Sequence, residues 1–589
     1  MPLVFRLLYA GALALSVSTP VLISPGCHST QISGSQHLPE LPREYVDTSY
    51  VKPTGKIITV SASGDFQAAL DKARPGDVIT LQSGAVYTGN FVLPAKSGGD
   101  WITVESSATN SMLPKPGNRV SPADAINMPK LEATSGSVLT AAPGANHYRL
   151  IGLEIRPGVP QASMMHKALS WVEGKLQDSV TSASGGAPSN AVFLENLVSF
   201  GANDTSSEML PNHIIFDRCY IHGDAVVGAR RGIALNASYA AVIDSYLSNF
   251  KEVGADSQAI LVWNGPGPFK IVNNYLEASG ENVMFGGQDP TIPGLVPSDI
   301  EIRGNYFAKP LTWKISDPTY LGTPWSIKNL FELKNASRVL VDGNLFEYNW
   351  AQSQDGFSIL FTVRDQDGTA PWSIVSDVTF TNNVVRHVAS GINILGRDND
   401  YESQQAQRIL IANNLFDDVG GDWGDGTLLL IGSSAIDVTF RHNTSLQTGT
   451  IVFGDGNPDP GFTFTDNITP NNQYGIIGSN TGVGKETLAH YFPGGDVRKN
   501  VIVGGVAGVY PPDNYFPKSL SAVGFENLTA HDYSLAGSSS YIHKASDGTA
   551  IGADMHRLCT ALSSSGQQLS NSVASCGGTK NSEQSGDKI

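Results

Sequence analysis

Three basic residues end short apolar segments in the middle of this 589-residue chain and are the first candidates for chemistry: Lys334, Arg364 and Arg397. If the segments lie side by side as strands, about 4.8 Å apart, the cations form a column about 10 Å long. Such a column can bind the carboxylates of an acidic polymer, and Lys334 or Arg364 can act as a general base. Asp365 and Asp398 follow two of these cations, so they either share in substrate binding or neutralise the cations within structural loops.

Four carboxylates on or beside neighbouring segments suggest further chemistry: Asp256, Glu281, Asp289 and Glu332. The first three, with backbone carbonyls, offer the oxygen ligands that calcium prefers, so calcium is the predicted cofactor. Glu281 and Glu332 could instead be the acid and base that flank a glycosidic bond. Glu332 and Lys334 stand at positions i and i+2, on one side of a strand, either as a catalytic pair or as a surface ion pair.

Two more residues beside these segments suit a carbohydrate ligand. Trp263 ends a predicted strand, where its ring either stacks on a sugar or covers an edge of the core. Arg231 precedes another predicted strand and either extends the basic patch or lies in a solvated turn. Both are therefore predicted to contribute to substrate binding.

The elements that must position these side chains form a repeat. A short strand of alternating apolar residues, a turn residue that is mostly Asn, and a second strand recur, as in IEIRGNYFA (300–308) and VTFTNNVVR (378–386). Successive turn positions are at least roughly 23 residues apart, and longer spacings mark inserted loops. The predicted column of turn residues is Gly152, Asn196, Cys219, Ser245, Asn274, Asn305, Asn344, Asn383, Asn414, Asn443, Asn467 and Asn500.

A strand repeat of this length, without a helical period, is typical of a solenoid with three strands per coil. Asn suits its tight turns, and stacked Asn amides can bond to one another. The pattern resembles the right-handed parallel β-helix of the pectate-lyase-like superfamily, which implies an all-β solenoid of about twelve turns. The resemblance also implies that substrate lies along the strands after the third turn, predicted here at 232–237, 259–265, 281–287, 329–335, 358–365, 391–398 and 427–433.

Both ends of the repeat carry segments that resemble β-helix caps. Residues 64–84 begin with an amphipathic helix in which Phe66, Leu70 and Ala73 share a face, and residues 532–554 resemble the closing segment of bacterial β-helix proteins. The predicted organisation is a signal peptide at 1–27, a linker at 28–54, one β-helix domain at 55–557 and a disordered Ser/Gly-rich tail at 558–589.

The N-terminus and the cysteines indicate export. Arg6 precedes an apolar run, residues 7–17, that is too short to span a bilayer and is typical of a secretory signal peptide. Cys27 leaves with that signal or carries a lipid, while Cys559 and Cys576 could close a loop in an oxidising compartment. We expect a secreted, periplasmic or cell-surface protein without a transmembrane span, and a solenoid that grows along one axis predicts a monomer.

The resemblance implies an extracellular polysaccharide as the partner, and the composition argues against a nucleic acid. A net charge of −16 argues against a general nucleic-acid binder, which needs a basic face. The pectate lyase signature WIDH and the galacturonase motifs are absent, so no specific enzyme family follows from the resemblance. Three functions remain open: first a lyase that cleaves a polyuronate by β-elimination, then a glycoside hydrolase on the same fold, and then a non-catalytic binding protein.

Overall fold

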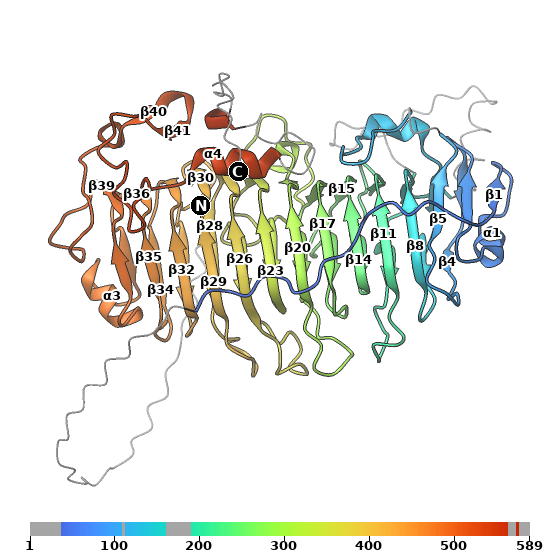
Figure 1. The fold of residues 1–589 in the computed structure, drawn as a ribbon, viewed down its shortest axis with the longest axis horizontal. Helices are drawn as coiled ribbons and strands as arrows, with labels where there is room; N and C mark the ends of the chain where they lie inside the picture. Colours follow the sequence, from blue (N-terminus) through green and yellow to red (C-terminus); the bar gives the residue numbers. More distant parts are fainter. Residues whose placement is uncertain (1–36, 109–111, 161–189, 564–572, 577–589) are drawn as a thin grey trace, which may run out of the picture. The chain divides into compact units, whose positions relative to one another are not determined.

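The computed structural model describes residues 37–108, 112–160, 190–563 and 573–576, and it is a right-handed parallel β-helix (Figure 1). Three parallel sheets, which we name A, B and C, run along the coil with 14, 13 and 12 strands. Each coil contributes one strand to each sheet because the chain returns to the same sheet only after passing through the other two. The predicted fold class is therefore confirmed. The predicted signal peptide and Cys27 lie outside the described residues.

Sheet A faces the viewer in Figure 1. Successive side chains along each of its strands point alternately into the core and out to the surface. Its strands are β1 (Ile57–Val60), β2 (Val78–Leu81), β5 (Ile102–Ser106), β8 (Asn146–Ile151), β11 (Asn212–Asp217), β14 (Ser238–Ile243), β17 (Phe269–Val272), β20 (Ser298–Arg303), β23 (Ala336–Asp342), β26 (Val375–Thr381), β29 (Gln407–Ala412), β32 (Ile436–Arg441), β35 (Thr463–Thr465) and β38 (Asp496–Arg498).

Sheet B follows sheet A in each coil after a tight turn. Its strands are β3 (Val86–Thr88), β6 (Lys130–Ala133), β9 (Glu154–Pro157), β12 (Tyr220–His222), β15 (Tyr246–Phe250), β18 (Tyr275–Ala278), β21 (Tyr306–Ala308), β24 (Leu345–Asn349), β27 (Val384–Val388), β30 (Leu415–Val419), β33 (Thr444–Gln447), β36 (Ile468–Pro470) and β39 (Val501–Val503).

Sheet C completes each coil and contains all seven strands on which the sequence predicts the substrate to lie. Its strands are β4 (Phe91–Leu93), β7 (Leu139–Ala141), β10 (Asn196–Phe200), β13 (Arg231–Leu235), β16 (Gln258–Val262), β19 (Glu281–Phe285), β22 (Phe331–Leu333), β25 (Phe357–Thr362), β28 (Ser390–Leu395), β31 (Leu429–Gly432), β34 (Val452–Asp455) and β37 (Ile476–Gly478).

An asparagine ladder forms the turn from sheet A to sheet B. In the central coils each Asn side chain accepts from the backbone N–H of the ladder residue before it, as Asn383 Oδ1 does from Asn344 at 2.9 Å. The left-handed backbone belongs to the residue before the ladder position, such as Asn382 with φ 55° and Asn413 with φ 57°. The predicted column is correct from Cys219 to Asn500, but not at its two earlier members. Gly152, with φ 62°, takes the left-handed position before Leu153, and Asn196 begins β10 in sheet C.

The ladder extends one residue beyond the predicted column. Asn514 Oδ1 accepts from the backbone N–H of Asn500 at 3.0 Å, although Asn514 belongs to no named strand. Inside the coil, aromatic rings stack from one turn to the next, as Phe307 and Phe346 do with ring centroids 4.4 Å apart. Such ladders bury a continuous apolar core along the axis.

Helices close both ends of the coil. Helix α1 (Phe66–Lys72) begins at Asp65, whose side chain accepts from the backbone N–H of Ala68, and it packs Phe66 against Tyr87 and Phe91. The N-terminal cap is thus where the sequence predicts it. The remaining elements are α3 (Lys485–Tyr491), α4 (Met555–Ser563), β40 (Phe525–Asn527), β41 (Asp532–Leu535) and the short 3₁₀ helices at Pro122–Asn127, Leu311–Trp313, Leu520–Val523, Leu528–Ala530 and Ala574–Cys576.

Two segments outside the predicted domain pack against the sheets. Residues 37–54, predicted as a linker, instead form a strap along the outer face of sheet A, where the backbone N–H of Glu40 donates to Asp377 and that of Arg43 to Asp299. At the other end, α4 lies over sheet B, and Cys559 is disulfide-bonded to Cys576. The predicted tail therefore begins within an ordered helix. No helix in the described part of the chain has the length and apolarity to cross a membrane.

Candidate functional site

A cluster of charged side chains lies where sheet C begins, on the strands that the sequence predicts to carry substrate. We call it the sheet C cluster. It consists of Arg231, Asp256, Gln258, Glu281, Lys328, Glu332 and Lys334. Consecutive strands β13, β16, β19 and β22 bring these residues together, although the chain between the first and the last is about a hundred residues long.

Hydrogen bonds link three of these strands. The Arg231 guanidinium donates to Gln258 Oε1 at 2.9 Å, and Gln258 Nε2 donates to Glu281 Oε2 at 2.7 Å. Strand pairing requires this order, because Arg231 is level with Gln258 and Gln258 with Glu281. The predicted binding residue Arg231 therefore joins the predicted carboxylates in one network.

Lys328 brings a cation to the middle of the cluster. Its ammonium lies 2.6 Å from Asp256 Oδ1 and 3.5 Å from Glu281 Oε1. Although burial alone would lower it, the carboxylates of Glu281 and Asp256 raise the pKa of Lys328 above its ordinary value. Lys328 thus stays charged and holds two of the predicted functional carboxylates.

Glu332 and Lys334 occupy the next strand. Glu332 is 2% exposed, and its Oε2 accepts from Asn329 Nδ2 at 2.8 Å. The Lys334 ammonium lies 3.8 Å from Glu332 Oε1 and 3.3 Å from Gln366 Oε1, with 17% of its side chain exposed. Lys334 is therefore the less tightly held and more accessible partner.

Glu281 is the carboxyl most perturbed by the cluster. It is fully buried, and its Oε1 accepts no hydrogen bond from the described residues. Burial first, and then the neighbouring charges of Glu332 and Asp256, raise the pKa of Glu281. A raised pKa favours the protonated form of the Glu281 carboxyl, which a general acid requires.

A buried lysine beneath the cluster supports the turn that leads to Glu281. Lys309 is 0% exposed and donates to the carbonyl oxygens of Ala278, Ser279 and Gly280, and to Asn282 Oδ1, at 2.6 to 3.1 Å. Burial lowers the pKa of Lys309 to about 7. These contacts fix the backbone on both sides of Glu281.

The three predicted cations follow the ends of successive sheet C strands, β22, β25 and β28. Strand pairing sets Leu333 opposite Phe361, and beyond that pair the backbone N–H of Arg364 donates to the carbonyl oxygen of Lys334 at 3.0 Å. Arg364 and Arg397 do correspond, since Thr362 pairs with Leu395 and each Arg follows two residues later.

Local partners hold the two arginines. The Arg364 guanidinium donates to Asp398 Oδ1 at 2.8 Å and also to Asn399. Burial would raise the pKa of Asp398, but hydrogen bonds from the Asp400 backbone and Arg364 lower it. Arg397 is exposed and donates to Gln405 at 3.1 Å. Neutralisation within the loops thus applies to Arg364, while Arg397 remains accessible.

The predicted calcium ligands Asp289 and Asp256 contact other groups of the protein. Asp289 accepts from the backbone N–H groups of Gln366, Asp367 and Thr369 at 2.7 to 3.1 Å, so its oxygens fasten a loop. Asp256 is engaged by Lys328, as described above. Across the described ranges, no group of three His, Cys, Asp or Glu side chains is spaced to hold a metal ion. Calcium binding by these residues therefore stays a prediction.

Asp365 and Trp263, both predicted to bind substrate, are buried in local contacts. Asp365 is 1% exposed and accepts from the backbone N–H of Ala370 at 2.9 Å, and burial raises its pKa. Trp263 is 5% exposed and packs with Leu261 and Met284, which leaves almost no ring face for a sugar. The alternative in which Trp263 covers an edge of the core describes its position better.

Aromatic rings gather instead at the corner between sheets B and C. They are Trp313, Trp325, Tyr348, Trp350 and Trp423. The ammonium of Lys251 lies 5.4 Å and 5.0 Å from the ring centroids of Trp313 and Trp325. Of the five rings, those of Trp325, Tyr348 and Trp423 are partly exposed. This corner adjoins Lys328, which follows Trp325 by three residues.

Gln258, Lys309 and Lys328 belong to the site or support it but are not among the residues predicted from the sequence. Lys328 and Lys309 lie in the segments between sheets B and C, where no repeat position marks them. Gln258 was hidden because an uncharged amide in a strand carries no signal of its own. A register-exact alignment of the sheet C strands would have placed Gln258 between Arg231 and Glu281.

Comparisons with known proteins concern the fold. No protein-family model matches the chain, and no curated protein matches it. A mannuronic acid-specific family 6 polysaccharide lyase from the human gut microbiota is 12% identical, over 79% of this chain and 83% of that one, with a TM-score of 0.39. An alpha-1,3-glucanase of family GH87 from Streptomyces thermodiastaticus is 12% identical, over 81% and 72%, with a TM-score of 0.40.

A pectate lyase is 11% identical, over 85% of this chain and 96% of that one, with a TM-score of 0.29. These solved structures are polysaccharide lyases or glycoside hydrolases on a β-helix, and at such identities the likeness extends to the fold alone.

Proposed function

We propose that this protein is a secreted or cell-surface carbohydrate-active β-helix protein that cleaves an acidic polysaccharide by β-elimination at the sheet C cluster. The observation that carries the proposal is Lys334: it is the partly exposed base candidate, beside a network of cations that can bind a uronate carboxylate. The Cys559–Cys576 disulfide supports an oxidising, extracytoplasmic location.

The proposed reaction needs only side chains of the cluster. Lys334, acting as the base, removes the proton from the carbon next to the sugar carboxylate, a double bond forms, and the glycosidic carbon–oxygen bond breaks. The Lys334 ammonium then protonates the leaving oxygen. Lys328 and Arg231, which are 19% and 16% exposed in their side chains, bind the carboxylate and stabilise charge at the transition state.

The test is to incubate the full chain with polygalacturonate, alginate and chondroitin, with calcium or with a chelator, and to follow the ultraviolet absorbance of unsaturated products. We expect absorbance to rise with a uronate, and Lys334→Met to abolish the rise while Lys544→Met, an exposed control in the C-terminal cap, leaves it unchanged. Calcium dependence remains a prediction that the chelator arm decides. No absorbance change with any of the three polymers would rule out the lyase.

A second candidate is a glycoside hydrolase that uses Glu281 and Glu332. The observation that favours it is the raised pKa of Glu281 beside a second buried carboxyl. It predicts new reducing ends without a rise in ultraviolet absorbance. Glu332→Gln should abolish the release of these reducing ends. Retained polysaccharide binding without turnover would instead identify a binding protein.

A further inference from the structure

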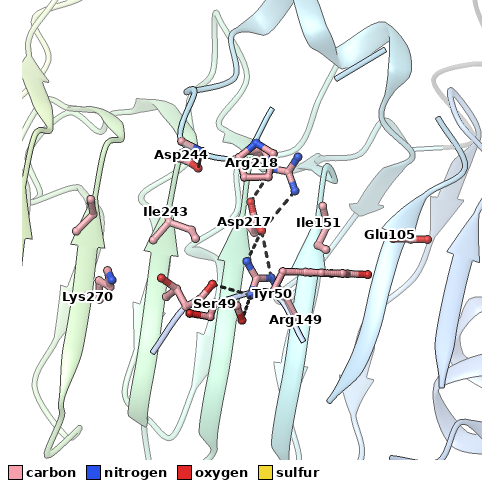
Figure 2. Close-up of a pocket in the computed structure, with 14 residues that line it drawn as sticks. Ser49, Tyr50, Glu105, Arg149, Ile151, Asp217, Arg218, Ile243, Asp244 and Lys270 are labelled. Carbon is pink, nitrogen blue, oxygen red and sulfur yellow. Dashed lines mark hydrogen bonds and ion pairs between the residues drawn. The ribbon is translucent and has the colours of Figure 1, made fainter. Parts of the chain in front are cut away.

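A cavity lies on the outer face of sheet A, away from the strands of the sheet C cluster. Its volume is about 710 Å³, and strands β5, β8, β11, β14 and β17 form its floor. Residues 48–50 of the strap line one side of it (Figure 2). The N-terminal strap therefore forms one wall of the cavity where it crosses the sheet.

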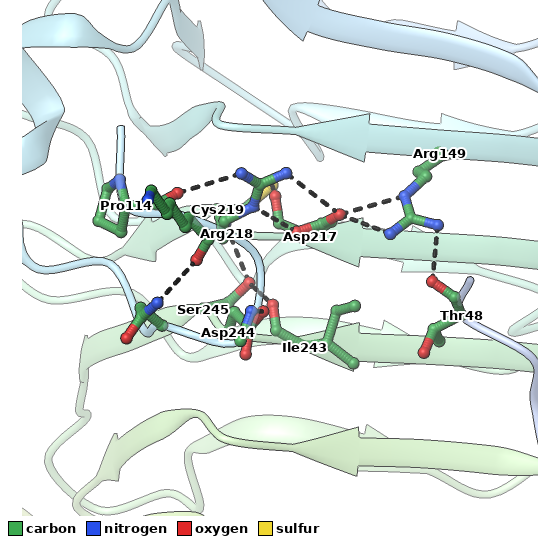
Figure 3. A network of polar contacts seen from close by, with 12 residues as sticks. Thr48, Pro114, Arg149, Asp217, Arg218, Cys219, Ile243, Asp244 and Ser245 are labelled. Carbon is green, nitrogen blue, oxygen red and sulfur yellow. Dashed lines mark hydrogen bonds and ion pairs between the residues drawn. The ribbon is translucent and has the colours of Figure 1, made fainter. Parts of the chain in front are cut away.

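A rigid ionic network shapes the cavity (Figure 3). Asp217 accepts from Arg149 at 2.7 Å and from Arg218 at 2.7 Å, and all three side chains are at most 6% exposed. Arg149 also donates to the carbonyl oxygens of Thr48 and Ser49 at 2.9 and 3.1 Å, which ties the strap to the floor. Because their donors and acceptors are engaged, these residues build the site and leave recognition to others.

The remaining surface is amphipathic. Ile151, Ile243 and Val272 occupy one row of aligned strand positions, in which the buried Asp217 lies between Ile151 and Ile243, and they give the floor its apolar parts. Tyr50 forms a wall: it is 54% exposed, and its ring centroid lies 5.6 Å from the Arg149 guanidinium carbon. A flat apolar floor beside an exposed aromatic ring suits the C–H face of a sugar.

Two polar side chains, Glu105 and Lys270, lie at opposite ends of the cavity and suit a ligand that both donates and accepts hydrogen bonds. Glu105 makes no hydrogen bond or ion pair with any described residue, and burial raises its pKa. Among the described residues, the one ion-pair partner of the Lys270 ammonium is the distant Glu301 carboxylate at 4.0 Å. One free carboxyl and one loosely held ammonium can both bond to sugar hydroxyls.

The cavity continues along the coil. A smaller one of about 220 Å³ shares Glu105 and Ile151 with it and reaches Thr80 on β2. From β17 to β2 the groove crosses five strand spacings, about 24 Å, the length of a short oligosaccharide.

We propose that this sheet A groove binds a neutral oligosaccharide, as a second carbohydrate site independent of the proposed cleavage site. The charges that line it balance: Arg149, Arg218 and Lys270 against Glu105, Asp217 and Asp244. A neutral chain meets no net field there, whereas a polyuronate would meet Asp244 and Glu105 without an uncommitted pair of cations.

The experiment titrates the full chain with cellopentaose, xylopentaose, mannopentaose and maltopentaose by calorimetry. At least one should bind, and Tyr50→Ala or Lys270→Ala should weaken that binding about tenfold or more. Tyr45→Ala is the matched control, because Tyr45 is a 47% exposed tyrosine of the same strap that does not line the cavity. It should bind as the wild type does.

Lys334→Met separates this site from the cleavage site, and it should leave the binding of the neutral pentasaccharide unchanged whether or not it affects lyase activity. Absence of binding by all four neutral sugars would overturn the proposal. So would binding that survives Tyr50→Ala and Lys270→Ala together. A parallel titration with pentagalacturonate adds a third outcome that would overturn it, a preference for this acidic sugar that Lys270→Ala removes.

Discussion

Buried carboxylates in this protein differ in how many donors reach them. Asp217 receives two guanidinium groups, and Glu281 receives one amide with an ammonium farther away. Asp459 accepts from the backbone N–H of Ala435 at 2.7 Å, while its Oδ2 has no partner among the described residues. Burial consequently raises the pKa of Asp459 to about 8.

Asp459 predicts a pH-dependent loss of stability. The folded protein keeps its proton up to about pH 8, whereas the unfolded chain releases it near the ordinary value of 3.8. Unfolding therefore releases a proton between these values, and the free energy of unfolding falls as the pH rises through that window. Asp459→Asn should remove this loss, with a gain on the order of several kcal/mol at about pH 9 and almost none at about pH 4.

Denaturant unfolding of both proteins at the two pH values measures the effect. Asp455→Asn is the control, because Asp455 is exposed on the same segment of chain. Equal stabilities of Asp459→Asn and wild type at the higher pH would contradict the prediction.

At the scale of the element, the asparagine ladder holds the turns together. Asn383 joins three coils: its Oδ1 accepts from Asn344, and its Nδ2 donates to the Val341 carbonyl at 3.0 Å and to Asn414 Oδ1 at 3.1 Å. Asn383→Ala should lower the free energy of unfolding by on the order of 3 kcal/mol, because it leaves buried groups unpaired. Denaturant unfolding measures the loss.

The matched control is Asn457→Ala, since Asn457 is an exposed loop residue. Its backbone carbonyl accepts from the backbone N–H of Ser434, a bond that the substitution leaves in place. It should change stability little. A ladder substitution no costlier than this control would show that the turns are held by the strands alone.

How far the sequence predicts the elements depends on the range of their contacts. The turn column and the sheet C strands are predictable because strand period and Asn spacing are local signals. Asn196 misled because one inserted loop changes the phase of the count. The strap and the position of Lys328 could not be predicted: Glu40 contacts Asp377 across 337 residues, and Lys328 contacts Asp256 across 72.

At the scale of the whole molecule, a solenoid must cover both its ends and its sides. The outer face of sheet B exposes apolar residues in its later coils, including Leu345, Val384 and Leu415, and α4 covers them with Leu558 and Leu562. An uncovered row of this kind would be an aggregation-prone patch. The disulfide between Cys559 and Cys576 secures α4 in place, with 17 residues of separation.

Reduction should therefore loosen the C-terminal cover and leave the coil intact. Closing a loop of this length stabilises by about 3 kcal/mol, and that contribution belongs to the cover because no other strand depends on it. With a reductant, or in the Cys559→Ser/Cys576→Ser variant, we expect faster amide exchange in α4, trypsin cleavage after the exposed Arg557, and more light scattering on heating. Amide exchange in the central strands should not change.

Cys219→Ser serves as the control, since Cys219 is buried and forms no disulfide, and this variant should respond to reductant as the wild type does. If exchange in α4 and cleavage at Arg557 were the same with and without reductant, apolar packing alone would hold the cover, and the disulfide would have no part in protecting sheet B.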